Sequence, residues 1–285
     1  MRTTPVGEPL KAAALVLALM FSASGCGSHT PTQPAPLPNA DFFESGGARL
    51  HFVLELPPGA GPFPAVVIGQ GAGRATTSDG AVYVPFLLAR GFAVLRYDKR
   101  GVGQSTGTYR GVSAANSEAQ SAELGGDMVA ALNFLAARGG IDAARLGLMG
   151  TSQAGWVMVA AAERSPLARF AIAVTGSVMP IGVNIAYEQL RGLPIDDAYA
   201  QLASYSGPRG YDPGPALQGL DVPTLWLLGG QDRLVPTREC LRALDALRAE
   251  GARTESVVYS DEGHGLLGAD YWPDIDAFLR RNGLS

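Results

Sequence analysis

Gly150–Gly155, with the sequence GTSQAG, joins two short apolar runs at residues 146–149 and 156–162. A strand, a sharp turn and a helix with a serine at the apex form a nucleophile elbow, in which the turn pushes the serine hydroxyl above the sheet. Small residues must flank that serine, because the helix and the neighbouring strands pass close to it. The last glycine of the G-x-S-x-G pattern is Ala154 here, which is still small. A plain Gly-rich turn is the alternative, and the strand-helix context favours Ser152 as a nucleophile.

The composition is that of a folded, weakly acidic chain. It has 285 residues, of which 47% are hydrophobic and 17% charged, and a net charge of −4. This length is enough for one large globular domain or two small ones. No run of Lys and Arg forms a basic patch, so we expect no nucleic-acid partner. The two cysteines and three histidines are scattered, without C-x-x-C or H-E-x-x-H spacing, and we expect neither a catalytic metal nor a cofactor.

Residues 1–25 have the pattern of an export signal. The positive side chains Arg2 and Lys11 precede an apolar run at residues 12–21, which is too short to span a bilayer. The sequence that follows, ASGCG, resembles a bacterial lipoprotein box, which implies that Cys26 is lipidated and becomes the N-terminus. That pattern usually has leucine three positions before the cysteine, where this chain has alanine. Ordinary secretion, with Cys26 free or removed, is the alternative.

Residues 26–40 contain four prolines among polar residues and predict an extended tether. A tether after a lipid anchor would hold a folded domain away from the membrane surface. We therefore expect an exported chain in the cell envelope, bound to the membrane through the lipid anchor alone, and otherwise periplasmic or secreted. The folded domain then spans residues 41–285.

Buried strands and helices alternate through this domain, which predicts an α/β fold with a mainly parallel, doubly wound sheet flanked by helices. One segment breaks the alternation. At residues 179–219 there are about forty residues where a connection of roughly 2–6 would suffice. Because the segment leaves the carboxyl end of a strand, where α/β proteins bind ligands, we interpret it as a lid over the site. A peripheral decoration is the alternative. The expected elements are a hairpin at 42–57, strands at 65–68, 92–97, 146–149, 170–174, 224–228 and 255–259, and helices at 81–90, 118–138, 156–162, 236–250 and 271–280.

A serine hydroxyl needs a base to act as a nucleophile near neutral pH, and the base needs a carboxylate to orient it. His264 follows the last predicted strand on a Gly-flanked turn, whereas His29 lies in the tether and His51 in the first hairpin. Asp232 lies in the loop after the penultimate strand, and the loop after the preceding strand contains no carboxylate. We predict a triad of Ser152, Asp232 and His264. A surface-loop histidine and a helix-capping aspartate are the alternatives.

The oxyanion of the transition state needs preorganised N–H donors. The residue after the nucleophile, Gln153, is the first candidate. The second comes from the Gly-rich loop after the early strand, at Gly71 or Ala72, and we prefer Ala72. The glycines at 71 and 73 do not complete a G-x-G-x-x-G pattern, and no Walker lysine follows, so nucleotide binding is not predicted.

Residues 42–282 resemble the α/β-hydrolase superfamily, and most closely its bacterial esterase and dienelactone-hydrolase-like group, which grades into prolyl-oligopeptidase-type domains. The order Ser, acid, His is the order of this superfamily. The resemblance implies the α/β-hydrolase fold, hydrolase activity, and a structural role beside the site for Asp98 and Arg100. It rests on four segments: YDKRGVGQS at 97–105, GTSQAGW at 150–156, GGQDRLVP at 229–236 and GHG at 263–265.

Two departures from the group concern the site. Members commonly have His-Gly where this chain has Gln70-Gly71, although the second oxyanion donor is a backbone N–H in either case. A dienelactone hydrolase proper has a cysteine nucleophile, and Ser152 argues against that reaction.

The sequence thus predicts a serine esterase that acts on a small or medium carboxylic ester through an acyl-enzyme. The Tyr and Leu side chains of the 179–219 segment would line an apolar pocket for this small-molecule substrate. Two alternatives remain open. One is an amide-cleaving peptidase of the prolyl-oligopeptidase type with the same triad, and the other is a surface-anchored binding protein that has lost catalysis.

Overall fold

The computed structural model describes residues 41–284. The predicted export signal, the tether and Cys26 lie outside this range. Within it, no helix combines the length and the apolar character needed to cross a bilayer.

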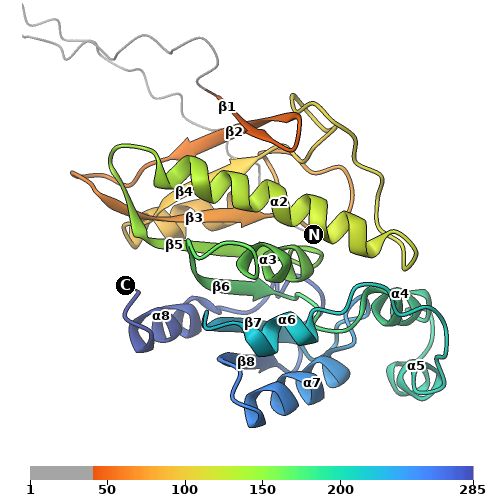
Figure 1. Cartoon of the computed structure of the whole chain (residues 1–285). Helices are drawn as coiled ribbons and strands as arrows, with labels where there is room; N and C mark the ends of the chain where they lie inside the picture. Colours follow the sequence, from red (N-terminus) through yellow and green to blue (C-terminus); the bar gives the residue numbers. More distant parts are fainter. Residues whose placement is uncertain (1–40, 285) are drawn as a thin grey trace, which may run out of the picture. The chain divides into compact units, whose positions relative to one another are not determined.

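An eight-stranded sheet forms the centre of the described domain, with the strand order β1-β2-β4-β3-β5-β6-β7-β8 (Figure 1). The first two strands form the predicted hairpin, β2 pairs antiparallel with β4, and every later neighbour pairs in parallel. This confirms the mainly parallel α/β-hydrolase fold. The strands are β1 (Phe42–Ser45), β2 (Ala48–Glu55), β3 (Phe63–Gly69), β4 (Ala93–Tyr97), β5 (Ile141–Thr151), β6 (Ala168–Val174), β7 (Thr224–Gly229) and β8 (Thr254–Tyr259).

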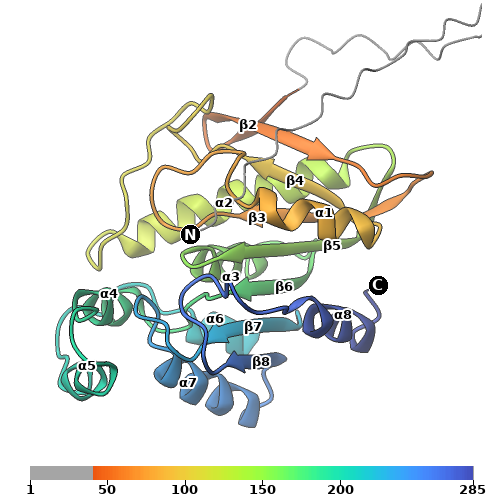
Figure 2. The same ribbon diagram turned by 180° about the vertical axis from the view of Figure 1, so that it is seen from behind.

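Helices cover both faces of the sheet, as a parallel sheet requires. One face carries α2 (Ser117–Ala136), α3 (Ala154–Ala162), α6 (Gly214–Gly219) and α7 (Thr237–Ala249). The other carries α1 (Val84–Ala89) and α8 (Trp272–Arg281), as Figure 2 shows from behind. The apolar stripe of α2 faces the sheet and is buried, at Leu124, Met128, Leu132 and Leu135.

Two elements differ from the sequence-based expectation. The strand β5 begins at Ile141, five residues before the apolar run. The sequence does not indicate this early part because residues 142–145 are polar or small and are partly buried or exposed. The helix expected at 81–90 is a 3₁₀ turn, Ala81–Tyr83, followed by α1. Pro85 lacks the N–H that would bond to the carbonyl of Ala81, so the regular α-helical ladder starts after it.

The segment between β6 and β7 folds into three short helices. The last of them, α6, packs onto the main core through Leu217. The first two, α4 (Ile181–Gln189) and α5 (Ile195–Leu202), lie beyond the end of the sheet (Figure 1). They form an apolar cluster of their own, around Tyr187 and Tyr199.

Candidate active site

Ser152 sits at the turn between β5 and α3 with a positive φ of 58°. A non-glycine residue rarely adopts this left-handed conformation, and it persists only where the surroundings enforce it. Here the N–H of Ser152 donates to the carbonyl of Val174 at 3.1 Å, and the carbonyl of Ser152 accepts from Gly155 at 2.9 Å. The strained backbone of an elbow is therefore present at the predicted nucleophile.

The alanine that replaces the last glycine of the pattern fits because two glycines face it. A Cβ built on Gly69 would lie 2.9 Å from the Cβ of Ala154, and one built on Gly150 would lie 2.5 Å from it. Both distances are shorter than real side chains allow. The methyl group of Ala154 thus fills space that β3 and β5 leave empty.

The structure brings Asp232 and His264 together. The Nδ1 atom of His264 lies 2.8 Å from Oδ2 of Asp232. The second carboxylate oxygen, Oδ1, accepts hydrogen bonds from the N–H groups of Leu234 at 2.7 Å and Val235 at 2.9 Å. The aspartate side chain is 1% exposed and that of the histidine 22%. A buried carboxylate held by three donors cannot rotate, so it fixes the orientation of the imidazole ring.

Ser152 and His264 line the same pocket, which has a volume of about 390 Å³. The Gly-rich loop after β3 forms one wall and Leu234, from the loop of the candidate acid, lies on another. Tyr83 closes the pocket beside the nucleophile, where its phenol is hydrogen-bonded to Thr151. Burial raises the pKa of Tyr83, so this phenol stays neutral at physiological pH.

The two predicted oxyanion donors have free N–H groups. Within residues 41–284, no acceptor takes a hydrogen bond from the backbone N–H of Ala72 or of Gln153. The neighbouring N–H of Gly73 is already used, because it donates to the phenol oxygen of Tyr109 at 3.1 Å. Ala72 lines the pocket with Ser152, and Gln153 follows the nucleophile directly.

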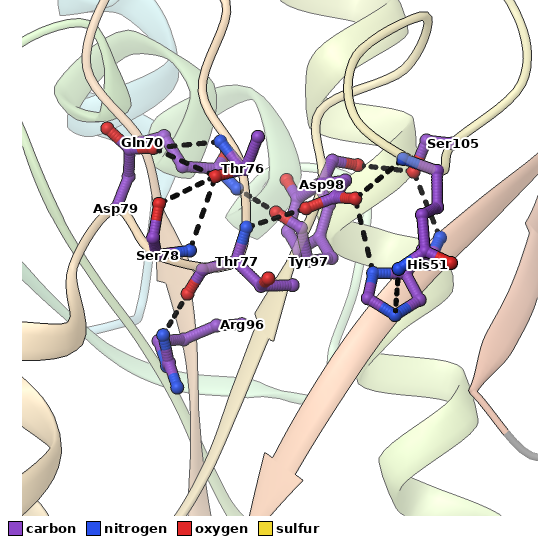
Figure 3. Close-up of polar contacts among 11 residues, drawn as sticks. His51, Gln70, Thr76, Thr77, Ser78, Asp79, Arg96, Tyr97, Asp98 and Ser105 are labelled. Atoms are coloured by element: carbon purple, nitrogen blue, oxygen red, sulfur yellow. Dashed lines mark hydrogen bonds and ion pairs between the residues drawn. The ribbon is translucent and has the colours of Figure 1, made fainter.

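The carboxylate of Asp98, after β4, organises the loops beside the pocket (Figure 3). It accepts hydrogen bonds from the N–H groups of Thr77 at 2.7 Å and Gln104 at 2.8 Å. The Nδ1 atom of His51 lies 3.2 Å from its second oxygen. A Cβ at Gly103 would lie 2.2 Å from that oxygen, which explains the glycine there.

A second Ser-His-Asp grouping at this place has the wrong geometry for catalysis. The hydroxyl of Ser105 donates to the carbonyl of Asp98 at 2.7 Å and accepts from the N–H of His51 at 2.9 Å. It is thus bound to backbone groups rather than to the imidazole ring. Arg100 acts at a different place, where it joins this loop to α2 through Asp127, at 2.8 Å, and Glu123, at 2.6 Å.

A second cavity, of about 530 Å³, adjoins the pocket and shares Ala72 with it. Its walls are Tyr109 and Val112 on one side and α4 on the other, with Ile185 and Glu188. The segment interpreted as a lid therefore borders the cleft next to the candidate nucleophile. Whether it opens and closes stays a prediction.

Two contacts of the site were not predicted. Lys99 Nζ bonds to the Gly-rich loop and to the side chain of Gln153, and the phenol of Tyr187 on α4 bonds to the carbonyl of Asp232. Lys99 stands in the YDKRGVGQS segment, which could have drawn attention to it. Nothing in the local sequence connects Tyr187 with a residue 45 positions later.

Among residues 41–284, no three His, Cys, Asp or Glu side chains gather as a metal site would require. The thiol of Cys240 is buried, and burial raises its pKa to about 11. A buried thiol of this kind is unreactive, so Cys240 is a core residue.

Comparison with known proteins identifies the family. A model of the prolyl oligopeptidase family matches residues 81–280, a span that contains Ser152, Asp232 and His264. The chain belongs to the prolyl oligopeptidase family. The match begins at the 3₁₀ turn before α1 and extends into α8, and it leaves out β1 to β3 and the Gly-rich loop that carries Ala72.

Individual relatives are distant. The chain is 26% identical over 154 residues to acylamino-acid-releasing enzyme 1 of Oryza sativa. This alignment covers 49% of this chain and 20% of that protein. It is 27% identical over 172 residues to a carboxymethylenebutenolidase-like protein of Methylorubrum extorquens, covering 60% of this chain and 51% of that protein. The chain therefore spans between a fifth and about half of the length of these curated relatives.

Solved structures share the fold. An esterase of Pyrococcus furiosus superposes with a TM-score of 0.63 at 17% identity, over 84% of this chain and 89% of that one. The superposition shows a common α/β-hydrolase fold, and substrate choice has to be argued from the site.

Proposed function

We propose that this chain is a serine hydrolase that cleaves carboxylic esters through an acyl-enzyme intermediate. One observation carries the proposal: His264 Nδ1 lies 2.8 Å from Asp232 Oδ2, in a pocket that His264 lines together with Ser152. Because Asp232 engages Nδ1, Nε2 is the ring nitrogen left to take a proton from the serine hydroxyl.

The reaction follows from these positions. Oγ of Ser152 attacks the acyl carbonyl carbon while its proton passes to Nε2 of His264. The carbonyl oxygen becomes an oxyanion, which the N–H groups of Gln153 and Ala72 stabilise. The bond to the alcohol oxygen then breaks, and the alcohol leaves with the proton from His264. Water attacks the acyl-enzyme by the same route and releases the acid.

The size of the pocket supports a small or medium acyl group. A volume of about 390 Å³ lies at the lower end of small-molecule sites. The adjoining cavity beside α4 is available to the other half of the substrate, since Ala72 lies between the two. We propose that the acyl group occupies the inner pocket and the alcohol extends toward α4.

Amide cleavage is the second candidate function, and the family match favours it. Amides differ from esters in the leaving group, because the nitrogen of an amide must be protonated before the amine departs. Comparing kcat/KM for a p-nitrophenyl ester and a p-nitroanilide with the same acyl group separates the two. Because the activated ester would also react faster than the anilide with a peptidase, the expected result is hydrolysis of the ester with no hydrolysis of the anilide that depends on Ser152. Hydrolysis of the anilide that depends on Ser152 would establish a peptidase instead.

We also propose that the chain is exported and anchored through a lipid at Cys26, as the lipoprotein-like sequence suggests. Mass spectrometry of the N-terminal peptide from the envelope fraction tests this. The expected peptide begins at Cys26 and carries the mass of a lipid. An unmodified N-terminus at any other residue would contradict the proposal.

A further inference from the structure

Lys99 is the only lysine among residues 41–284, where the other long basic side chains are all arginines. It is 2% exposed. Its ammonium has three acceptors at once: the carbonyl of Gly71 at 2.7 Å, the carbonyl of Gly73 at 3.2 Å and Oε1 of Gln153 at 3.0 Å. A compact ammonium has three donors that match three converging acceptors, whereas a planar guanidinium does not.

All three acceptors are neutral. Among the ion pairs of residues 41–284 none includes Lys99, and the ring of Tyr109 covers the ammonium at 4.6 Å. Burying a cation without a counter-ion costs free energy, and burial lowers the pKa of Lys99 to about 8, with the charge of Asp79 acting in the opposite direction. A neutral side chain could brace the same loop without this cost. We therefore expect the charge of Lys99, and not only its hydrogen bonds, to have a function at this position.

The place is the candidate oxyanion site. A Cβ at Gly71 would lie 3.7 Å from the Cβ of Ser152, so the Gly-rich loop passes directly over the nucleophile. In a planar trans peptide the C=O and the next N–H point in opposite directions. The bond from Lys99 to the carbonyl of Gly71 therefore turns the N–H of Ala72 away from the ammonium. The same ammonium holds the side chain of Gln153, whose N–H is the other donor.

We infer that Lys99 is a positioning residue for the oxyanion hole: it fixes the Gly71–Ala72 peptide and Gln153 so that both N–H groups meet the oxyanion, and its charge stabilises that oxyanion. The inference rests on the proposed hydrolase function. No bond to Lys99 forms or breaks during the reaction. Its contribution is made in the transition state, when the carbonyl oxygen gains negative charge, and is small in the ground state.

The test compares Lys99→Met and Lys99→Gln with the wild-type chain on a p-nitrophenyl ester. A matched control is Arg74→Met, because Arg74 is an exposed cation of the same loop that donates to the carbonyl of Gly101 at 2.9 Å. The measurements are kcat, KM, the inhibition constant of a trifluoromethyl ketone analogue of the acyl group, and the melting temperature. The ketone forms a tetrahedral oxyanion with the serine, so its affinity reports on the oxyanion site.

We expect Lys99→Met to lower kcat by about 100- to 1000-fold, as loss of one oxyanion donor does, with KM within about threefold of wild type. The inhibition constant of the ketone should rise by the same factor as kcat/KM falls, and the melting temperature shows whether the variant stays folded at the temperature of the assay. Lys99→Gln, which keeps donors without the charge, should fall between, and it carries the test if the Met variant does not fold. Arg74→Met should match wild type.

Other results would overturn the inference. A kcat within about threefold of wild type in both Lys99 variants would show that Lys99 does not position the oxyanion hole. A loss of kcat with an unchanged inhibition constant for the ketone would show the same. A wild-type chain without activity that depends on Ser152 would instead overturn the proposed function, and this inference with it. Activity of the wild type and inactivity of Ser152→Ala, with active Lys99 variants, would refute the inference alone.

Discussion

The phenol of Tyr187 donates a hydrogen bond of 3.0 Å to the main-chain carbonyl of Asp232, so the first helix of the inserted segment is attached to the loop of the candidate acid. Nδ2 of Asn184, on the same helix, donates to the carbonyl of Leu234 at 3.2 Å. In return, Arg233 donates to the carbonyl of Arg191 at 3.1 Å. Burial raises the pKa of Tyr187, which keeps its phenol a donor at neutral pH. The insertion and the acid loop thus form one hydrogen-bonded unit.

Replacing Tyr187 by Phe should lower activity, although Tyr187 does not line the pocket that contains Ser152 and His264. We expect a two- to tenfold fall in kcat/KM and about 1 kcal/mol of lost stability, because one buried hydrogen bond disappears and the carbonyl of Asp232 loses its partner. Tyr205→Phe is the matched control: Tyr205 packs against the same apolar cluster, but its phenol donates to the carbonyl of Pro208, at 2.8 Å, and not to the loop of the acid. Equal kcat/KM values in the two variants would show that the insertion does not position Asp232.

Replacing Asp232 by Asn should lower kcat by about 100- to 10,000-fold while KM changes little. An amide at this position can present its NH₂ group to Nδ1, which favours the wrong tautomer of His264 and removes the charge that stabilises the imidazolium. Asp261→Asn is the control, since Asp261 is exposed and lies three residues from His264. If Asp261→Asn were the more damaging change in steady-state kinetics, the assignment of the acid would be wrong.

The fit between Gly69 and Ala154 predicts a rescue. Gly69→Ala should destabilise the chain by about 1–3 kcal/mol in urea unfolding, because its methyl group would meet Ala154 Cβ at 2.9 Å and Met128 Cε at 3.2 Å. Adding Ala154→Gly removes one of these contacts and should recover part of the loss.

A control for this cycle is Gly126→Ala in α2, where an added Cβ meets nothing within 4 Å. It should not destabilise the chain, since alanine favours the helix by about 1 kcal/mol. If Gly69→Ala and Ala154→Gly were strictly additive, the two sites would not share the space that the structure assigns to them.

The titration of Lys99 should appear as an alkaline limit on activity. Its ammonium is charged below about pH 8 and is lost as the pH rises through that value, so kcat/KM should fall there. Carbon-13 NMR with labelled lysine follows the group directly, and the Lys99→Met variant identifies its signal. A Lys99 signal that stays constant to pH 9.5 would contradict this prediction.

Stability should respond in the opposite direction. The pKa of Lys99 is lower in the folded chain than its ordinary value of 10.5, so the unfolded chain binds more protons between about pH 8 and 10.5. The contribution of Lys99 to the free energy of unfolding therefore rises with pH in that window. A fall in activity without a matching loss of stability separates this titration from alkaline unfolding.

Much of the fold could be predicted from the sequence because its signals are local. The apolar runs of the central strands, the stripe of α2 and the Gly-rich turns each lie within a few neighbouring residues. The order of the elbow, the acid turn and the Gly-flanked histidine then follows from the chain itself. The early part of β5 was missed because its polar residues do not resemble a buried strand.

The supporting contacts of the site are long-range and have no local signature. Ala154 is accommodated by Gly69, which lies on another strand, and Lys99 acts on residues 28 positions before it and 54 positions after it. Such contacts depend on how the strands are ordered and packed. The strand order places β3 between β4 and β5, and this is what brings the three loops together.

The central claim is that Ser152 is the nucleophile of an ester hydrolase. The most direct measurement is hydrolysis of p-nitrophenyl esters from acetate to palmitate by the purified wild-type chain and by Ser152→Ala. The account predicts activity that is greatest for short or medium acyl groups and that disappears in the Ser152→Ala variant, whose fold is intact by circular dichroism. A folded wild-type chain that hydrolyses none of these esters, or equal activity in the two proteins, would contradict it.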